Sequence, residues 1–310
     1  MTQTALPTTL TEAIRYFTDE KVCLEFVAQL RWPQGPICPK CTSQNVGFLA
    51  TRSLWKCKGC YKQFSVKVGT IFEDSAIKLD KWLCAIWMIV NAKNGISSYE
   101  VARSLGVTQK TAWFMMHRIR LALQTGSFKL EGEVEVDETY IGGKARYMHG
   151  DKLAKGKRRH GSVGKAIVVG MLERGGRVKA RVIPQATQGI LYDELRNHIQ
   201  RGSQVFTDEY ASYRGLKPDY VHRVINHSEA YVQGHVHTNN IENYWSLLKR
   251  TIRGTYVSVE PFHLFRYLDE QAFRFNTRKD TDQGRFLNAM FTVGGRRLTY
   301  QRLTRHAGSC

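Results

Sequence analysis

Two C-x-x-C pairs near the N-terminus constrain the fold of this chain more than any other feature. Their members are Cys38, Cys41, Cys57 and Cys60. The tight turn within each pair lets two thiolates reach one ion, and residues 42–56 give the spacing between pairs that is expected of tetrahedral structural zinc. Four thiolates leave no open coordination position, so the site would fold a small module and would not catalyse.

The spacing predicts a zinc ribbon over residues 32–68, with short strands at Val46–Leu49 and Ser53–Lys56. Chance pairs and two disulfides in a secreted mini-domain are the alternatives. Met1–Leu10 lacks the basic start and apolar core of a signal peptide, which argues against secretion. The other cysteines show no pairing pattern, as expected in a reducing cytosol. They are Cys23, Cys84 and Cys310.

Length and charge set the class of protein. A chain of 310 residues is expected to form two or three domains. The longest apolar candidate, Trp82–Val90, is about half a membrane span, so no membrane segment is predicted. The net charge of +19, from 46 basic and 27 acidic side chains, points to nucleic acid, with a basic solvated surface as the alternative.

The segment 69–125 is predicted to bind DNA through a helix-turn-helix. Ser98–Leu105 would form the first helix, Gly106 would end it, and Thr108 would cap a second helix that runs through Arg120. An ordinary pair of helices is the alternative. The residues expected to face outward toward DNA are Gln109, Lys110, Thr111 and His117.

Two other helices are predicted before this pair. Residues 1–31 form a helical lead-in that Thr11 could cap, and a helix over residues 81–91 could be capped by Asp80. Residues 281–310 are expected to form a C-terminal tail.

From residue 126 to 280 the pattern changes to that of a mixed sheet flanked by helices. Glu133–Asp137 alternates valines with carboxylates, which predicts a half-buried strand, and Lys165–Leu172 reads as a buried strand. A third strand, a helix, a strand, a short helix, a strand and further helices follow. This order is the layout of an RNase H-like domain, which makes the whole chain an α+β or α/β multidomain protein.

Three carboxylates are placed to form a second metal centre. Asp137 is expected to end the first strand, Asp208 ends the fourth, and Glu242 begins a helix that would cross them. Three close negative charges are costly without cations, and two Mg²⁺ ions about 4 Å apart give the arrangement for in-line phosphodiester displacement. Lys249, two turns after Glu242, could contact a phosphate. A solvated strand end, a helix cap and a first-turn charge are the simpler explanations of the carboxylates.

A basic loop over residues 144–160 lies between the first two strands of this domain. Solvation and DNA contact are both open for it. The candidate DNA contacts in the loop are Lys144, Lys155, Lys157, Arg158 and Arg159.

With these motifs in this order, the chain resembles bacterial insertion-sequence transposases of the DDE type that carry an N-terminal zinc ribbon, the ISXO2-like group, which is related to eukaryotic Merlin transposons. The motifs are Cys38-Pro39-x-Cys41 with Cys57-x-x-Cys60, Glu135–Lys144, Thr207–Tyr210, His237–Arg250 and Tyr267–Asn276. The resemblance covers most of the chain.

The resemblance implies a cytoplasmic, nucleoid-associated bacterial enzyme that acts as a dimer or larger assembly on double-stranded DNA. Its DNA would be the terminal inverted repeats of its element and a target, and its ions structural zinc with catalytic Mg²⁺ or Mn²⁺. Asp137 and Asp208 match the first two carboxylates. Family members carry Glu or Asn at the third, and Glu242 is favoured here. Further candidates are His237, Asn239, Asn243, Lys249 and Arg250.

Two other functions remain open at this stage. One is a zinc-ribbon and helix-turn-helix regulator derived from a transposase, without catalysis. The other is a nuclease that cuts DNA strands but cannot join them.

Overall fold

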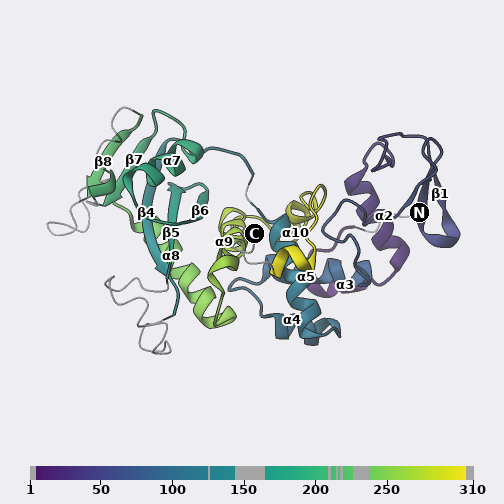
Figure 1. The fold of residues 1–310 in the computed structure, drawn as a ribbon. Helices are drawn as coiled ribbons and strands as arrows, with labels where there is room; N and C mark the ends of the chain where they lie inside the picture. The colour runs from purple at the N-terminus through teal and green to yellow at the C-terminus, as the bar shows by residue number, and fades with distance from the viewer. Residues whose placement is uncertain are drawn as a thin grey trace. The chain divides into compact units, whose positions relative to one another are not determined.

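The computed structural model describes residues 5–124, 126–143, 165–208, 211–213, 216, 219–225 and 237–304. The chain divides into two compact units, whose elements are labelled in Figure 1. The first unit contains Met1–Gln124 and Lys279–Cys310, and the second contains Thr125–Arg278. The second unit is therefore inserted in sequence between two parts of the first.

The first unit begins with α1 (Leu10–Tyr16) and α2 (Glu20–Arg31). The α1 cap is Thr9, whose hydroxyl accepts from the Glu12 N–H while the Glu12 carboxylate accepts from the Thr9 N–H. The prediction of Thr11 as the cap is wrong, because the reciprocal capping box requires the acid three residues after the cap.

The ribbon is a three-stranded antiparallel sheet in the order β1-β2-β3. Its strands are β1 (Val46–Leu49), β2 (Leu54–Cys57) and β3 (Gln63–Phe64). Trp32, which follows α2, meets the Trp55 ring edge-on at 5.2 Å between centroids, so an aromatic cluster connects α2 to the ribbon.

Helix α3 (Leu79–Asn91) is the apolar centre of the first unit, with both of its tryptophans about 1% exposed. Its N-cap is Lys78, so Asp80 lies within the first turn and the prediction that Asp80 caps the helix is wrong. A carboxylate in the first turn still interacts favourably with the helix dipole.

The helix pair follows as α4 (Ser98–Leu105) and α5 (Gln109–Ala122). Gly106 ends α4 with φ of 60°, and Thr108 caps α5 by accepting from the Thr111 N–H. Both helices begin where the sequence predicts.

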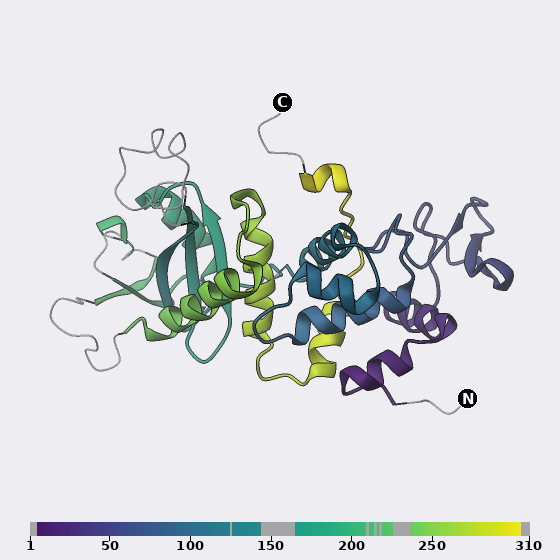
Figure 2. The same ribbon diagram turned by 90° about the horizontal axis from the view of Figure 1, so that it is seen from below.

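The chain returns to the first unit in α10 (Asp282–Met290), and α11 (Tyr300–Thr304) follows. Phe286 of α10 is 2% exposed, and its ring lies 5.7 Å from Phe17, 5.9 Å from Phe26 and 5.1 Å from Trp87. Figure 2 shows α10 beside the helices of this unit. Residues from both ends of the sequence therefore share one core.

The second unit contains a five-stranded mixed sheet in the order β6-β5-β4-β7-β8. Strand β5 pairs antiparallel with both β4 and β6, whereas β7 pairs parallel with both β4 and β8. The strands are β4 (Glu133–Ile141), β5 (Ala166–Glu173), β6 (Val178–Ile183), β7 (Gln204–Asp208) and β8 (Val221–Ile225). Because β4 continues to Ile141, Asp137 lies in the middle of the strand, and the prediction that it ends the strand is wrong.

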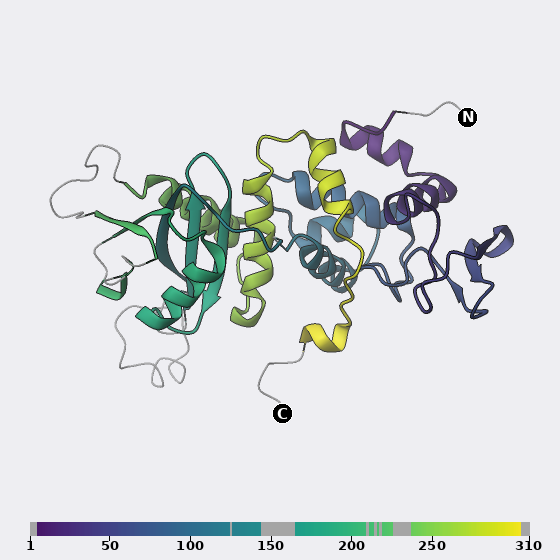
Figure 3. The same cartoon turned by 90° about the horizontal axis from the view of Figure 1, so that it is seen from above.

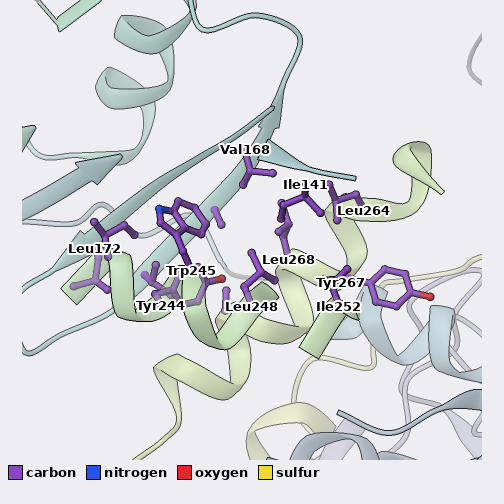
Figure 4. Close-up of a cluster of buried hydrophobic side chains, with 14 residues drawn as sticks. Ile141, Val168, Leu172, Tyr244, Trp245, Leu248, Ile252, Leu264, Tyr267 and Leu268 are labelled. Atoms are coloured by element: carbon purple, nitrogen blue, oxygen red, sulfur yellow. The ribbon is translucent and has the colours of Figure 1, made fainter. Parts of the chain in front are cut away.

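Helices cover both faces of the sheet (Figure 3). On one face α7 (Gln188–His198) packs against β-strand residues that include Val134 and Val136. On the other, α8 (Asn239–Thr251) and α9 (Leu264–Asn276) pack against Val168 and Leu172 in the cluster of Figure 4. The alternation along β4 thus places its valines toward α7 and leaves Glu135 and Asp137 toward α8.

Irregular segments complete the second unit. They are the short η3 (Ala211–Tyr213), a π-helical turn η4 (Ile252–Tyr256) that extends α8, and η5 (Pro261–His263). Val257, directly after η4, has φ of +61°, which is costly for a β-branched residue.

Candidate functional site

The four cysteines of the ribbon converge on one point. Their sulfur atoms all lie within 4.8 Å of one another, with Cys38–Cys60 at 3.6 Å and Cys41–Cys57 at 3.5 Å. A zinc ion about 2.3 Å from each sulfur would separate neighbouring sulfurs by about 3.8 Å. Disulfides require about 2.05 Å and are excluded.

The surrounding backbone favours thiolates at this position. The Cys60 N–H donates to the Cys57 sulfur at 3.4 Å and, as the largest influence, lowers the pKa of Cys57 to about 6. Since zinc binds the thiolate form, this donor supports the site, and the residues present fit a structural zinc ion. The structure thus brings the four predicted zinc ligands together.

The helix pair presents only part of the predicted DNA surface. Lys110 is exposed and lies 5.0 Å from the Tyr300 ring of α11, while Gln109 donates to Ser98 and Thr111 donates to the capping Thr108. His117 is fully buried, so its predicted outward orientation is wrong. Its ring meets Trp113, one turn earlier, at 4.4 Å, so the residue belongs to the interior of the unit.

The first two predicted carboxylates lie on adjacent strands. Strands β4 and β7 run parallel with Glu135 opposite Phe206, so continuing this register by two residues places Asp137 beside Asp208. Asp208 ends β7, as predicted. The strand pairing thus brings together residues that are far apart in sequence.

A buried carboxylate that sequence reasoning passed over, Glu135, positions the third. It is completely buried and accepts from the backbone N–H groups of Asn240 and Ile241, each at 3.0 Å, and from the Asn240 side chain at 2.8 Å. It therefore satisfies the free N–H groups of the first turn of α8 and holds this turn, with Glu242, against β4. The alternation of acids along β4 is the one sequence signal that could have indicated Glu135.

Arg174 compensates the buried charge of Glu135. Its Nε donates to Glu135 at 2.9 Å, another nitrogen donates to the His237 carbonyl at 2.8 Å, and its guanidinium lies 3.9 Å from the centroid of the Phe206 ring. His237 itself lies 3.3 Å from the Glu135 carboxylate through Nδ1. In the structure His237 therefore contacts the anchor of α8.

Trp245 of α8 holds Asp137. The indole N–H donates to Asp137 Oδ2 at 2.9 Å. Gly170, directly opposite Asp137 on β5, makes room for the ring, since a Cβ there would lie 2.5 Å from the indole carbons. The orientation of Asp137 thus depends on a glycine and a tryptophan from two other elements.

The surroundings of Asp137 raise its pKa to about 6. Burial is the largest cause, the Trp245 hydrogen bond opposes it, and the negative charges of Asp208 and Glu242 add to it. An ionised Asp137 is therefore costly in this site until a cation neutralises it.

The three carboxylates are neighbours, but their oxygen atoms do not converge. Within the described part of the chain, the four cysteines are the only group of at least three acidic, histidine or cysteine side chains that meets at one point. Glu242 is exposed and accepts from the Thr238 hydroxyl at 3.2 Å. Hard carboxylate oxygens from three elements suit divalent ions such as Mg²⁺, and two ions about 4 Å apart need no single meeting point.

A fourth carboxylate, Glu138, lies next to this group and was not predicted. It accepts from the Tyr213 hydroxyl, and burial raises the pKa of Glu138 to about 7, with the charges of Asp137 and Asp208 contributing. No sequence pattern distinguishes Glu138 from the other acids of β4.

The remaining predicted residues are divided between described and undescribed parts of the chain. Lys249 is half-buried, and burial, as the largest influence, lowers its pKa, while the charge of Asp137 raises it. Arg250, Asn239 and Asn243 are exposed on α8. The predicted contacts in the basic loop lie outside the described residues: Lys144, Lys155, Lys157, Arg158 and Arg159.

Two known families match this chain, one in each of its two compact units. Residues 129–276 match the family described as ISXO2-like transposase domain, and residues 18–63 match the transposase zinc-ribbon domain. The second match begins before the ribbon and so includes α2.

The names of two relatives refer to a transposable element or to a transposase. The chain is 30% identical over 250 residues to an uncharacterized protein in transposable element ISH50 of Halobacterium salinarum, a match that covers 76% of this chain and 84% of the relative. It is 30% identical over 103 residues to an uncharacterized transposase-like protein of Haemophilus influenzae, covering 33% and 83% of the two chains. The chain belongs to the ISXO2-like transposase family, as its motifs predict.

A solved structure also matches, a simian T-cell lymphotropic virus intasome in complex with PP2A regulatory subunit B56 gamma. The match has a TM-score of 0.28 at 12% identity and covers 61% of this chain and 65% of that chain. A score this low supports no argument about either fold or function. Separately, no described helix is both long and apolar enough to cross a membrane.

Proposed function

We propose that this chain binds the terminal inverted repeats of its element and catalyses metal-dependent cleavage of DNA strands and their transfer to target DNA. One observation carries the proposal. Asp137 lies beside Asp208 across the β4–β7 pair and is held by Trp245 of α8, the helix that also carries Glu242. Such a cluster is costly without cations and suited to phosphodiester chemistry with them.

Each residue would have a defined part in the reaction. Asp137, Asp208 and Glu242 would hold two Mg²⁺ or Mn²⁺ ions, which when bound activate the attacking water or 3′-hydroxyl and stabilise the leaving oxygen. Trp245 keeps Asp137 in one orientation, and Glu135 keeps the start of α8 in place. Lys249, two turns beyond Glu242, would contact a phosphate near the carboxylates.

The strand order supports an RNase H-like assignment for the second unit. Three consecutive antiparallel strands are followed by two parallel ones on the opposite side of β4, and the order of strands along the chain is the one expected from the sequence. We further propose that the zinc ribbon and the α4–α5 pair bind the DNA ends, that the active form is a dimer or larger, and that it works on DNA in the bacterial cytoplasm.

The test is nicking and strand transfer with a labelled element end in Mg²⁺, Mn²⁺ or Ca²⁺. Asp137→Asn and Asp208→Asn should each abolish both reactions while end binding persists, and Ca²⁺ should support binding with little cleavage. Asp193→Asn, an exposed acid on α7, is the matched control and should stay active. Robust cleavage by the Asp137→Asn, Asp208→Asn double variant, or full activity in EDTA, would contradict the proposal.

The same assay separates the alternatives. A regulator without catalysis would bind ends in every metal and cut in none, and a simple nuclease would cut without joining. For the third ligand, Glu242→Gln should be inactive. Activity in Glu242→Gln combined with inactivity in Asn239→Ala or Asn243→Ala would assign that position to an asparagine.

A further inference from the structure

A cavity of about 330 Å³ lies at the end of β4, beside Lys249 and outside the carboxylate cluster. Its walls come from two segments, the end of β4 with the following glycines and the region from the last turn of α8 through η4 to Val259. Its lining residues are Tyr140, Ile141, Gly142, Gly143, Lys249, Ile252, Arg253, Val257, Ser258 and Val259. The volume is at the lower end of the range for small-molecule sites.

The cavity combines apolar walls with two positive charges. Ile141, Ile252 and Val259 belong to or pack against the core beneath α8, so this part of the wall is fixed. Lys249 and Arg253 are one turn apart on the same side of the helix. Neither cation makes a hydrogen bond or an ion pair with any residue that the structure describes, so both are available to an anion.

The outer wall of the cavity is a strained and firmly anchored turn. The α-helix changes to a π-helical turn over Ile252–Tyr256, and Val257 follows with φ of +61° and 77% of its surface exposed. Tyr256 is anchored from below, since its hydroxyl donates to the buried Glu270, which also pairs with Arg274. π-helical turns and strained residues that the surrounding structure enforces cluster at ligand-binding sites.

The cavity is also near the proposed chemistry. Lys249 lines it, and the charge of Asp137 influences the pKa of that same lysine. An anionic group bound by Lys249 and Arg253 would therefore lie only a short way along the DNA strand from any phosphate held at the carboxylates.

We propose that this cavity receives one unstacked nucleotide of the DNA strand, with its base against the apolar wall and its phosphate on Lys249 and Arg253. The inference rests on the proposed function, because it takes the DNA end as the substrate. Taking a base out of the stack costs a few kcal/mol, which an apolar pocket and phosphate contacts can offset. Holding one nucleotide would set the register of the strand relative to Asp137.

The test uses element-end duplexes that carry 2-aminopurine at one position at a time. This base is quenched when stacked and brightens when it leaves the stack. With the wild-type chain in Ca²⁺, one position should brighten several-fold on binding while the others stay dark. Replacing Ca²⁺ with Mg²⁺ in the same sample then reports cleavage independently.

Variants of the cavity make the result specific. Ser258→Trp fills the cavity from an exposed position, and Val257→Gly removes one side chain of its outer wall. Each should lose the brightening while thermal melting shows a folded protein. Arg253→Gln should lower both the brightening and the salt dependence of binding, by about one counterion. Arg181→Gln is the control: this exposed cation of β6 does not line the cavity, so the brightening per bound complex should be unchanged.

Two results would overturn the inference. One is a complex that forms and is cleaved in Mg²⁺ while no position brightens. This includes the case in which Arg253→Gln changes only the salt dependence of binding, because the site would then hold a backbone phosphate and no base. The other is brightening that persists undiminished in both Ser258→Trp and Val257→Gly. Brightening without any cleavage would instead contradict the proposed catalysis and leave the cavity assignment supported.

Discussion

The zinc ribbon and the carboxylate site are built in opposite ways. The four sulfurs come from two tight turns of one small sheet and already lie close to the separations that a tetrahedral ion requires. The three carboxylates come from β4, β7 and α8, and they lie close enough to influence one another without converging. A structural ion thus has ligands whose positions depend on local sequence, whereas the catalytic ligands depend on the packing of a whole unit.

This comparison predicts its largest effect at the zinc site. Cys57→Ser, or removal of zinc with a chelator, should unfold the ribbon, because a sheet this small has little core without its ion. End binding should weaken by an order of magnitude or more, while the second unit keeps its secondary structure. Zinc content, DNA binding and limited proteolysis measure the three effects.

The control for that prediction is the removal of Mg²⁺. It should leave both units folded, since the core of the second unit does not include the carboxylate cluster. A purified chain with far less than one equivalent of zinc and a folded ribbon would contradict the assignment.

The next effect concerns the anchor of α8. Glu135→Gln should destabilise the second unit by about 3–5 kcal/mol, because it leaves Arg174 without its buried counter-charge and weakens the cap on α8. Glu133→Gln removes a more exposed partner of the same arginine and should cost less than about 1 kcal/mol. Chemical denaturation of the two variants measures the difference, and equal effects would show that Glu135 is no anchor.

A smaller effect is expected where Gly170 admits Trp245. Gly170→Ala should force the indole away from Asp137, destabilise the unit by about 1–3 kcal/mol and reduce nicking. Gly189→Ala, where an added Cβ meets nothing within 4 Å, is the matched control and should be close to neutral. If Gly170→Ala nicks at the wild-type rate, Trp245 does not position Asp137.

The raised pKa of Asp137 predicts how the stability of the protein changes with pH. The raised pKa of about 6 exceeds the usual value of 3.8, so the folded state binds more protons between these values and the free energy of unfolding falls as pH rises from about 4 to 6. Asp137→Asn removes this penalty and should stabilise the protein at pH 7 by up to about 3 kcal/mol, or several degrees in Tm.

That advantage should shrink as pH falls from 6 to 4 and vanish toward pH 3, below both pKa values, where Asp137 is protonated in both states. It should also shrink when Mg²⁺ neutralises the site in the wild-type chain. Melting curves of both proteins across pH, with and without Mg²⁺, test it. A difference in Tm that does not depend on pH would contradict a raised pKa at Asp137.

The sequence predicts features with local signals and misses those that depend on distant packing. Cysteine spacing, Gly106 and the capping Thr108 are local, and both the zinc site and the start of each helix in the pair follow from them. The buried position of His117 and the lengthening of β4 past Asp137 depend on neighbours far away in sequence.

The same distinction explains the candidate site. The alternation along β4 indicates which residues share a face, but it does not show that one acid, Glu135, would be completely buried under the first turn of α8. Gly170 and Trp245 carry no motif of their own that relates them to Asp137. Their relation exists only because β4, β5 and α8 meet.

The sharing of one core by both ends of the sequence has a consequence for synthesis. Phe286 completes an aromatic cluster with Phe17, Phe26 and Trp87, yet the ribosome makes it only after the entire inserted unit. At a synthesis rate of about 5–20 residues per second, the apolar surfaces of the partners of Phe286 stay uncovered for many seconds. The inserted unit can fold during that interval, so the unit that is begun first is the last to complete its core. A chain released early would carry an exposed apolar surface that cellular quality control could recognise.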